Sequence, residues 1–546
     1  MSVRLPVKRP GVAVIVAMLL VAAFASATSG ANPNSEIQQT KGFRNAVTVA
    51  GIREHQAAFQ AHSDANGGNR VAGSAAYAAS RDYVIQRMEA AGYEVSTHSF
   101  DFLYNADATP PVFAQIAPTP TSYVDGVDFA SMTFSPNGDF TAAVTAVDLI
   151  VPSPGADNGN TSGCEAADFA GFPAGTIALI QRGTCPFAQK AANADAAGAV
   201  AVIVFNEGQP GRTAAVAGTL GGPVAHDAPT IGTTFAIGDD LRNGVLNGAT
   251  GSTARVSVNR VFENRTTENV IAETPGGDPN RVVVAGAHLD SVSRGPGIND
   301  NGSGSGALLE IAEVFAAQDR EPRNKLRFMW FGAEEFGLLG SEAYIDDLSQ
   351  AERDRIELML NFDMVGSPNF VRFVYDGDNS AFPVGPNVAA GPPGSAEIER
   401  VFAHYFAAQG LMSEPTPFSG RSDYGPFIAA GVNIPAGGLF TGAEGIKTAA
   451  QQATYGGFAG DQYDPCYHLA CDTFAGTSTA YALSGLDQMS DAAAHAILLF
   501  SKRNFEQEPL VTTADAADLS LRQTSVGTAS DAPAPASDHD HEVVDR

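Results

Sequence analysis

The stretch from residue 281 to residue 310, RVVVAGAHLDSVSRGPGINDNGSGSGALLE, constrains the fold more than any other part of the chain. It opens with a β-branched apolar run at residues 282–284, which is too short for a helix and stops at Gly286. Such a run predicts a buried strand. A loop rich in glycine and asparagine follows, and residues 307–315 then predict a helix. The stretch therefore reads as one strand-loop-helix unit of an α/β sheet.

Three polar residues occupy the end of this predicted strand and the loop after it. His288 and Asp290 stand at the strand's exit, and Asp300 lies in the loop. In open α/β sheets, ligands bind outside the carboxyl ends of the strands, and glycines let the backbone approach closely enough for side chains to converge. The arrangement predicts a metal site at this edge of the sheet.

The same alternation of elements continues on both sides of this unit. Apolar runs predict further strands at 326–331, 358–364 and 432–435, with helices at 336–348, 395–409 and 491–501. Upstream, we expect residues 32–39 to be loose, a helix at 44–59, a helix capped by Ser74 and an antiparallel strand at 93–102. Arg70 and Gly73 need no role beyond a turn. This spacing predicts an α/β fold with a mostly parallel mixed sheet flanked by helices.

The N-terminus carries the pattern of a secretory signal peptide. Arg4, Lys8 and Arg9 precede an apolar run at 12–24, and small residues up to position 27 provide a cleavage site. The run is too short for a membrane span, and no later segment supplies about 20 unbroken apolar residues. We therefore expect a secreted, extracellular, soluble protein without stable membrane association.

The cysteines agree with an oxidising compartment. Four cysteines allow three pairings, and their positions favour Cys164 with Cys185 and Cys466 with Cys471, since these local pairs cross no domain boundary. A cysteine-rich zinc site would need a close CxxC pair, which the sequence lacks. The formal net charge of −28 argues against nucleic acid and anionic lipid as partners.

Residues 135–262 differ in character from the rest of the chain. They are rich in glycine, alanine and valine, with strands predicted at 176–181 and 200–205, and they hold no carboxylate pair beside a nucleophile. The segment CEAADFAGFPAGTIALIQRGTCPFAQKAANADAAGAVAVIVFNEG resembles the protease-associated (PA) domain, a non-catalytic insert of several peptidases. The expected organisation is a signal peptide at 1–27, the first part of a peptidase domain at 40–134, a small β-rich PA insert at 135–262, the catalytic domain at 263–505 and a disordered acidic tail at 506–546.

Further polar residues follow the other predicted strands. Glu334 and Glu335 come after one strand, Asp363 after another, and His468 lies in the loop held by the second cysteine pair. Together with His288 and Asp300 they form two carboxylate-plus-imidazole sets that share one carboxylate. Such sets leave a position for water and suit a pair of Zn²⁺ ions, although Co²⁺ and Mn²⁺ occupy similar sites.

Seven motifs in order carry a specific resemblance. AHLDS, INDNGSG, FGAEEFGLLGS, NFDMVG, GRSDYGPFIAAGV, GGLFTGAE and DPCYHLACD resemble the secreted di-zinc aminopeptidases of metallopeptidase family 28. The resemblance implies a zinc-peptidase-like fold and two Zn²⁺ per chain. It implies ligation by His288, Asp300 and Asp363 at one metal and by Asp300, Glu335 and His468 at the other, with Asp290 orienting His288.

The resemblance also implies catalytic and substrate-binding roles. Glu334 falls on the general base and Tyr467 on the donor to the developing oxyanion. Arg421 lines the end that receives the substrate's ammonium group, and Phe440 walls a pocket for a leucine-like first side chain. Asp487 and Asp491, one helical turn apart, fall where some relatives bind Ca²⁺.

These observations predict a secreted metallo-aminopeptidase that releases N-terminal, preferably bulky apolar residues from peptides with a free N-terminus. A dipeptidase or carboxypeptidase on the same fold is the alternative in the same enzyme class. A non-catalytic, receptor-like binding protein is a third reading, which the presence of all five ligands and Glu334 argues against. The sequence does not specify the oligomeric state, the natural substrate or the role of the insert.

Overall fold

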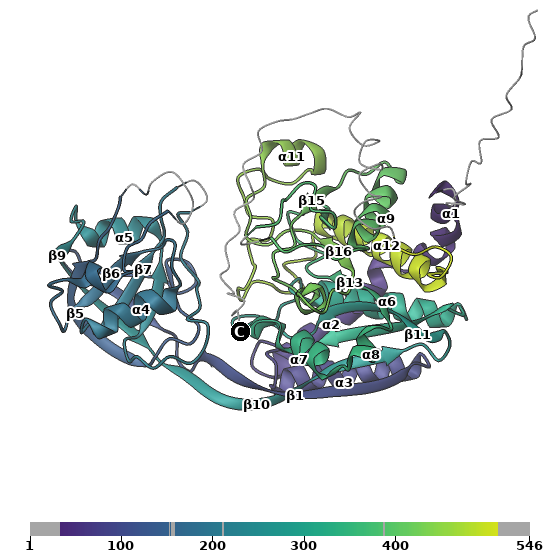
Figure 1. The fold of residues 1–546 in the computed structure, drawn as a ribbon, viewed down its shortest axis with the longest axis horizontal. Helices are drawn as coiled ribbons and strands as arrows, with labels where there is room; N and C mark the ends of the chain where they lie inside the picture. Colours follow the sequence, from purple (N-terminus) through teal and green to yellow (C-terminus); the bar gives the residue numbers. More distant parts are fainter. Residues whose placement is uncertain (1–32, 152, 154–158, 210–211, 386–387, 511–546) are drawn as a thin grey trace, which may run out of the picture.

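The structure is a computed structural model that describes residues 33–151, 153, 159–209, 212–385 and 388–510. Figure 1 shows two bodies side by side, a larger one that contains most of the helices and a smaller one. Two long antiparallel strands, β1 (Glu94–Asp107) and β10 (Arg260–Glu273), pair along their whole length and run from one body to the other.

The larger body is built on an eight-stranded sheet with the order β1-β10-β12-β11-β13-β16-β14-β15. Strands β12, β11, β13 and β16 run parallel at its centre, whereas β1, β10 and β14 are antiparallel to their inner neighbours. The prediction of a mostly parallel mixed sheet is confirmed. Besides β1 and β10, the strands of this sheet are β11 (Asp278–His288), β12 (Asn324–Phe331), β13 (Ile356–Phe362), β14 (Phe373–Tyr375), β15 (Glu414–Thr416) and β16 (Ala436–Phe440).

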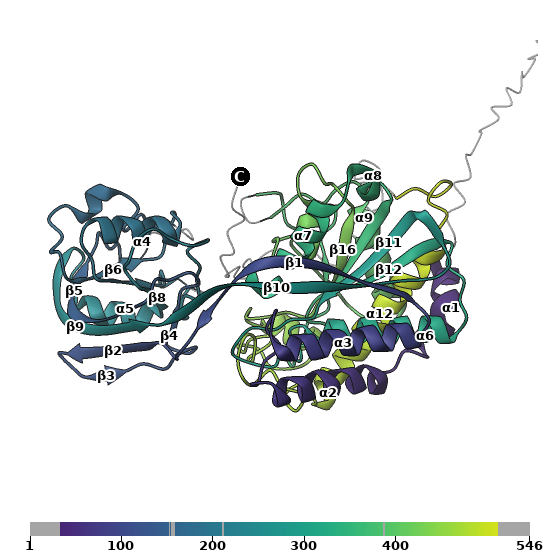
Figure 2. The same cartoon turned by 90° about the horizontal axis from the view of Figure 1, so that it is seen from below.

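Helices cover both faces of this sheet, and Figure 2 shows α2 and α3 on one side of the β1–β10 pair with α7 and α8 on the other. The thicker layer holds the helices α1 (Pro33–Arg44), α2 (Val49–Ala65), α3 (Ala75–Ala90), α6 (Gly302–Ala317), α9 (Ser395–Ala408) and α12 (Ala480–Lys502). The opposite layer holds α7 (Leu339–Asp347), α8 (Gln350–Arg353) and α10 (Tyr424–Ile428), and α11 (Ala449–Tyr455) lies in the long connection after β16.

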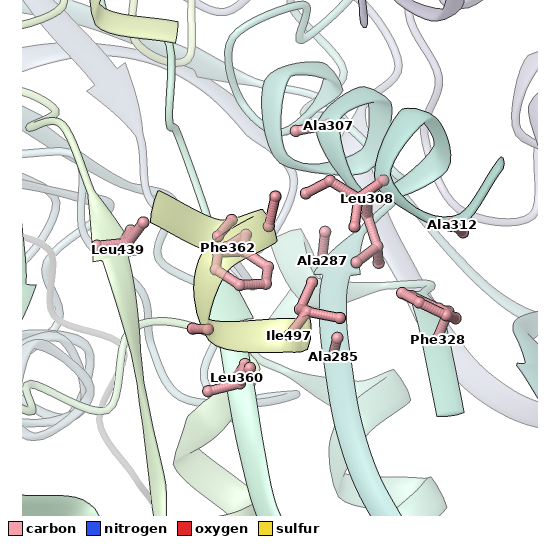
Figure 3. Close-up of a cluster of buried hydrophobic side chains, with 14 of the residues drawn as sticks. Ala285, Ala287, Ala307, Leu308, Ala312, Phe328, Leu360, Phe362, Leu439 and Ile497 are labelled. Atoms are coloured by element: carbon pink, nitrogen blue, oxygen red, sulfur yellow. The ribbon is translucent and has the colours of Figure 1, made fainter. Parts of the chain in front are cut away.

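The core follows from the alternation of side chains along each strand. In β11, Ala285 and Ala287 face the thicker helical layer, and Val282 and Val284 face the other layer. Figure 3 shows Ala287 of β11 beside Leu308 of α6, and Ala285 beside Ile497 of α12. Because alanine leaves room at the centre of the sheet, α6 packs closely on β11 and holds the loop between them in place.

The smaller body is built on a second eight-stranded sheet with the order β3-β2-β9-β5-β6-β7-β8-β4. Its strands are β2 (Val112–Ala117), β3 (Thr121–Ser122), β4 (Phe129–Ser131), β5 (Gly138–Ala146), β6 (Ile177–Gln181), β7 (Ala201–Phe205), β8 (Thr230–Thr233) and β9 (Gly248–Val258), and its helices are η1 (Ala166–Phe169), α4 (Phe187–Ala196) and α5 (Phe235–Arg242). Since β2 pairs with β9, β3 with β2, and β4 with β8, this sheet, and with it the insert, begins before residue 135.

Both predicted disulfides are present. Cys164 is joined to Cys185 in the smaller body, and Cys466 is joined to Cys471 in the larger one. The second bridge closes the short loop that carries His468. Each disulfide therefore lies within a single body.

The start of the described chain corrects two expectations. Residues 32–39 were expected to be loose, but α1 begins at Pro33 and packs against α12, so tertiary contacts override a polar local sequence. The single helix expected at 44–59 is interrupted. Thr48 ends the connection after α1 and caps α2, its side-chain oxygen accepting a hydrogen bond from the backbone N–H of Gly51 at 3.1 Å.

Three later boundaries also differ. The strand expected at 432–435 begins instead at Ala436, because Pro435 has no N–H to donate to a ladder. The helix expected from residue 336 begins at Leu339, since residues 334–336 form a short 3-10 turn. The last helix is longer than expected and spans Ala480–Lys502.

Some expectations concern residues outside the described part of the chain. The signal peptide at 1–27 and nearly all of the tail, from residue 511 on, lie there. Among the described residues, none of the helices combines the length and the apolar composition needed to cross a bilayer.

Candidate metal centre

Five acidic and imidazole side chains meet at the carboxyl edge of the central parallel strands. His288 is the last residue of β11, Asp363 directly follows β13, and Asp300 lies two residues before the start of α6. Glu335 lies in η2 (Glu334–Phe336), soon after β12, and His468 in the disulfide-closed loop. Residues separated by up to 180 positions in sequence, from His288 to His468, are thus brought to one point because parallel strands end at the same edge.

The five side chains form two sets of three that share Asp300, and in each set one ligand atom per residue lies within 4.8 Å of the others. In the first set, the Nε2 atom of His288 lies 3.2 Å from Oδ1 of Asp300 and 3.3 Å from Oδ1 of Asp363. In the second set, the Nε2 atom of His468 lies 3.2 Å from Oδ2 of Asp300 and 3.1 Å from Oε2 of Glu335. The two oxygens of Asp300 therefore face the two sets separately.

The donor set fits a pair of divalent cations. Each set offers one imidazole nitrogen and two carboxylates, the ligands that Zn²⁺ takes in catalytic sites. The Oδ1 atom of Asp363 is buried and has no hydrogen-bond partner among the described residues, and the residue as a whole is only 8% exposed. A buried carboxylate oxygen without a donor is costly, and a cation at this position would compensate it.

The crowding of charges at the centre shifts the pKa of several of its groups. Burial works to raise the pKa of Asp300, but the two imidazoles beside it outweigh burial and lower it. Burial works to lower the pKa of His288, but the carboxylates of Glu334 and Asp363 outweigh it and raise that pKa well above its usual value. For Glu334 itself, burial first and then the neighbouring carboxylates raise the pKa. The centre is a concentrated, largely buried cluster of negative charge that attracts cations.

Three non-glycine residues around the candidate ligands adopt the left-handed backbone conformation. Ala333, before Glu334, has φ 57°; Met364, after Asp363, has φ 49°; and His468 itself has φ 57°. This conformation costs roughly 1 kcal/mol or more for such residues and collects at functional sites, where surrounding contacts impose it. At this centre the chain turns sharply so that side chains leave the strand ends toward one point.

Neighbouring groups hold the first set of candidate ligands in place. The Asp290 carboxylate lies 3.6 Å from Nδ1 of His288 and accepts hydrogen bonds from the backbone N–H groups of Glu334 at 3.2 Å and Glu335 at 3.3 Å. The hydroxyl of Ser422 donates to Oδ2 of Asp363 at 2.6 Å. Asp290 thereby links the His288 strand to the turn that carries both glutamates.

The loop that carries Asp300 is held by residues that the sequence did not single out. The Asp472 carboxylate accepts hydrogen bonds from the backbone N–H of Asn299 at 2.7 Å and of Asp300 at 3.0 Å. The Asn299 side-chain amide donates to Asp464 at 2.6 Å. All of these residues lie inside or next to the seven quoted motifs, but only their meeting in space reveals that they act together.

Arg70 was expected to be no more than a turn residue, and this expectation is wrong. Its side chain is fully buried, and its guanidinium donates to the backbone carbonyls of Leu289, Pro296 and Gly297, the last two at 2.8 and 2.7 Å. It therefore braces the loop between His288 and Asp300. A fully buried arginine leaves no local sequence signal, because its partners are backbone atoms more than 200 positions away.

Of the residues predicted to contact the substrate, Tyr467 and Arg421 lie beside the candidate ligand His468, whereas Phe440 lies in an aromatic cluster. The Tyr467 ring stacks on His468 with centroids 3.8 Å apart, and Arg421 donates to the Tyr467 hydroxyl at 3.3 Å while it pairs with Glu444 at 3.0 Å. Phe440, at the end of β16, stacks on Phe373 with centroids 6.0 Å apart. Arg421 thus acts on Tyr467, whereas Phe440 is packed mainly against other aromatic residues.

The calcium expectation at Asp487 and Asp491 finds no support. Asp491 lies 3.5 Å from the guanidinium of Arg44, and neither acid belongs to a group of three candidate metal ligands among the described residues. The Arg44 guanidinium already compensates the charge of Asp491. The calcium site stays a prediction that nothing in the structure tests.

Comparisons with known proteins agree with the fold and the site. Residues 269–496 match the model of "Peptidase family M28", and residues 144–241 match that of the "PA domain". An "Aminopeptidase" of Pseudomonas aeruginosa (strain UCBPP-PA14) is 49% identical over 75% of this chain and 74% of its own length. "Leucine aminopeptidase 2" of Arthroderma otae is 42% identical over 78% of each chain. Among solved structures, the "Aminopeptidase from Aneurinibacillus sp. strain AM-1" is similar with a TM-score of 0.60 and 28% identity, covering 84% of this chain and 95% of that one.

The α/β fold, the site at its sheet edge and these matches define a peptidase, an enzyme that hydrolyses peptide bonds. The chain belongs to peptidase family M28 and carries an inserted PA domain. The family resemblance read from the seven sequence motifs is confirmed.

Proposed function

We propose that this protein is a secreted di-zinc aminopeptidase that releases bulky apolar residues from the N-termini of peptides. One observation carries the proposal above all others. Two sets of three candidate ligands share Asp300, and the carboxylate of Glu334 lies beside them without belonging to either set. The relatives named aminopeptidase and leucine aminopeptidase support the choice among peptidase activities.

The proposed ligands are His288, Asp300 and Asp363 for one Zn²⁺ and Asp300, Glu335 and His468 for the other. When bound, the two ions would polarise the scissile carbonyl and lower the pKa of water at the centre toward about 7. Zinc is favoured over magnesium or calcium because each set contains an imidazole nitrogen, whereas those two ions prefer oxygen ligands alone.

Glu334 is the proposed general base. Its Oε2 atom lies 3.9 Å from Nε2 of His288, and its side chain is 11% exposed, so it borders the centre and is almost dry. A carboxylate in this position can take the proton of the attacking water and return it to the leaving amine. Such a group contributes about 10²- to 10⁴-fold to the rate.

Tyr467 is the proposed donor to the oxyanion that develops on the scissile carbonyl. Burial raises the pKa of its hydroxyl well above 10, and the nearby Arg421 opposes this shift only partly, so the hydroxyl stays protonated at neutral pH. Its stacking on His468 and the hydrogen bond from Arg421 restrict its motion. A preorganised donor of this kind contributes roughly 3 kcal/mol to the transition state.

The charges around the centre favour an aminopeptidase over a carboxypeptidase. Two arginines that border the site are each engaged by an acid, Arg294 by Asp125 at 2.9 Å and Arg421 by Glu444 at 3.0 Å. A carboxypeptidase would need cations to bind a terminal carboxylate, whereas the acidic surroundings of Glu334 and Asp363 suit a terminal ammonium group. The preference for leucine-like residues rests on the fungal relatives and on the proposed contact with Phe440.

The leader and the disulfides support secretion. The signal-peptide pattern precedes residue 28, and all four cysteines are paired, as in proteins of oxidising compartments. N-terminal sequencing of the protein recovered from the culture medium tests this part of the proposal. Recovery only inside the cell, with Met1 intact, would contradict it.

Hydrolysis of leucine p-nitroanilide by the mature protein and by Glu334→Gln, with metal content measured on each, tests the activity. We expect two Zn²⁺ in both proteins and at least a 10²-fold lower kcat in the variant. The matched control is Glu342→Gln, on the exposed side of α7, which should keep the parent activity. Activity on N-acetylated but not on free peptides, or a parent that binds no metal, would refute the proposal.

A further inference from the structure

A cleft of about 720 Å³ lies between the two bodies and opens directly at the metal centre. Glu335, His468 and Tyr467 line one end of it, and residues of the PA insert line the other. This volume falls within the range of about 300–1,000 Å³ that encloses drug-sized ligands, a class that includes short peptides. The cleft is therefore continuous with the proposed catalytic centre and large enough for more than one amino-acid residue.

Both walls of the cleft are largely apolar. The insert contributes Val127 and Phe129, with the small residues of segment 213–219, and the larger body contributes Phe336, Ile446 and Leu469. Val127 is 64% exposed and Ile446 is 51% exposed, although both are large aliphatic side chains. Exposed apolar side chains that line a common cleft from two sides mark a binding surface for an apolar ligand.

The insert is docked against the loops that carry the candidate ligands. Asp125 pairs with Arg294 at 2.9 Å, and Arg294 lies in the loop between His288 and Asp300. Gly126, with φ +78°, approaches so closely that a Cβ atom there would lie 2.6 Å from a guanidinium nitrogen of Arg294 and 3.6 Å from Leu469, the neighbour of His468. This contact sets the insert's wall beside the metal centre.

We propose that the PA insert is part of the substrate-binding site and that Val127 and Ile446 hold the apolar side chains of the peptide residues that follow the first one. The inference rests on the proposed aminopeptidase function. With the first residue at the metal centre, the rest of the peptide must leave through the space that Glu335 and His468 border, and that space is the cleft. The insert then confers a preference for peptides with apolar residues downstream of the cleaved bond.

The test compares two substrates in the full-length mature protein. Leucine p-nitroanilide ends just beyond the scissile bond, whereas the tetrapeptide Leu-Ala-Leu-Ala extends into the cleft. We expect the ratio of kcat/KM for the tetrapeptide to kcat/KM for the anilide to fall at least fivefold in Val127→Asp and in Ile446→Asp. Matched controls are Val124→Asp, on the same insert loop and 58% exposed, and Met412→Asp, on the larger body and 58% exposed; neither lines the cleft, and both should keep the parent ratio.

A substrate with a positively charged side chain distinguishes direct contact with the peptide from a change in folding. If the side chain at position 127 contacts the peptide, Val127→Asp should hydrolyse Leu-Ala-Lys-Ala or Leu-Lys-Ala-Ala better than the leucine tetrapeptide, reversing the preference of the parent. Parent-like ratios in both cleft variants would overturn the inference and leave the proposed function standing. A parent that hydrolyses neither the anilide nor the tetrapeptide would overturn both.

Discussion

The carboxylate of Asp472 accepts a hydrogen bond from the backbone N–H of Asp300 at 3.0 Å, and its second oxygen accepts one from Asn299. Asp300 is the residue that both sets of candidate ligands share. A side chain from the disulfide-closed region thus orients the peptide groups around the proposed bridging ligand. This carboxylate, together with that of Asp464, holds the two loops of the centre to each other.

Asp472→Asn should weaken metal binding without changing any ligand. The amide would turn one acceptor into a donor that faces a backbone N–H, so the loop around Asp300 would shift. Loss of an outer support of this kind typically costs 10- to 100-fold in metal affinity, and competition with a chelator measures it. Asp461→Asn, at an exposed position of the same region, is the control. Equal affinities in the two variants would show that Asp472 has no positioning role.

Arg70→Met should destabilise the larger body. Methionine fills a similar volume but leaves the carbonyls of Leu289, Pro296 and Gly297 without their buried donor, which should cost about 3 kcal/mol or more. Urea unfolding followed by the fluorescence of Trp330, the single tryptophan and fully buried in β12, reports on this body. Arg81→Met removes a partly exposed ion pair and should cost no more than about 1 kcal/mol. Similar losses in both variants would contradict the bracing role.

Replacing both Cys466 and Cys471 by serine should weaken binding of the second metal, and with it the activity, as well as lower the free energy of unfolding. The bridge closes a loop of only a few residues, so its contribution to the free energy of unfolding is about 2 kcal/mol. The same bridge restrains His468, which adopts a left-handed backbone, and without it we expect roughly tenfold lower affinity for the second metal. Metal content and leucine p-nitroanilide hydrolysis measure the effect. Unchanged metal binding after loss of the bridge would be incompatible with this prediction.

Acid should destabilise the protein through His495. Burial, and then the positive charges of Arg44 and His404, lower the pKa of His495 from 6.5 to about 3 in the folded state. Because the unfolded chain binds the proton first, stability is complete above pH 6.5 and is lost as the pH falls toward 3. Between pH 6.5 and 5 this residue should account for about 2 kcal/mol.

The variant His495→Gln isolates this effect from other titrating groups. Glutamine can keep the contact with the Thr40 hydroxyl, which lies 2.8 Å from the histidine ring, but it does not titrate. The loss of stability between pH 7 and pH 5, measured by Trp330 fluorescence in urea, should be about 2 kcal/mol smaller in the variant. The same pH dependence in both proteins would rule out His495 as the source.

Removal of metal should lower thermal stability as well as activity. A ligand present at a thousand times its Kd stabilises the folded state by about 4 kcal/mol, and here the ions would also relieve repulsion among Asp300, Asp363 and Glu335. We expect chelation to abolish hydrolysis and to lower Tm by roughly 5 °C or more, with recovery of both on addition of Zn²⁺. A chelated protein with the parent Tm would argue against these carboxylates as ligands.

Most of the core and the site could be predicted from local patterns. The apolar runs of β11, β12 and β13 predicted parallel strands, and polar residues at their ends predicted which side chains would meet. That inference works because strand direction alone sends His288, Glu335 and Asp363 to one edge of a sheet. Spacing along the chain was enough to pair the cysteines within their own regions.

The supports of the site could not be predicted in this way. Arg70 and Asp472 act on backbone groups that lie far away in sequence, so no local sequence pattern indicates their roles. The start of α1 and the interruption before α2 were likewise decided by packing against α12 and by the cap at Thr48.

The sequence by itself determined the α/β class, the family and the residue types of the centre, because these depend on periodicity and on short motifs. Tertiary structure alone decided how the insert stands against the centre. The contact of Asp125 with Arg294 and the cleft between Val127 and Ile446 join segments with no shared local pattern. Such long-range contacts depend on how the β1–β10 pair connects the two bodies, and no single stretch of the sequence specifies that geometry.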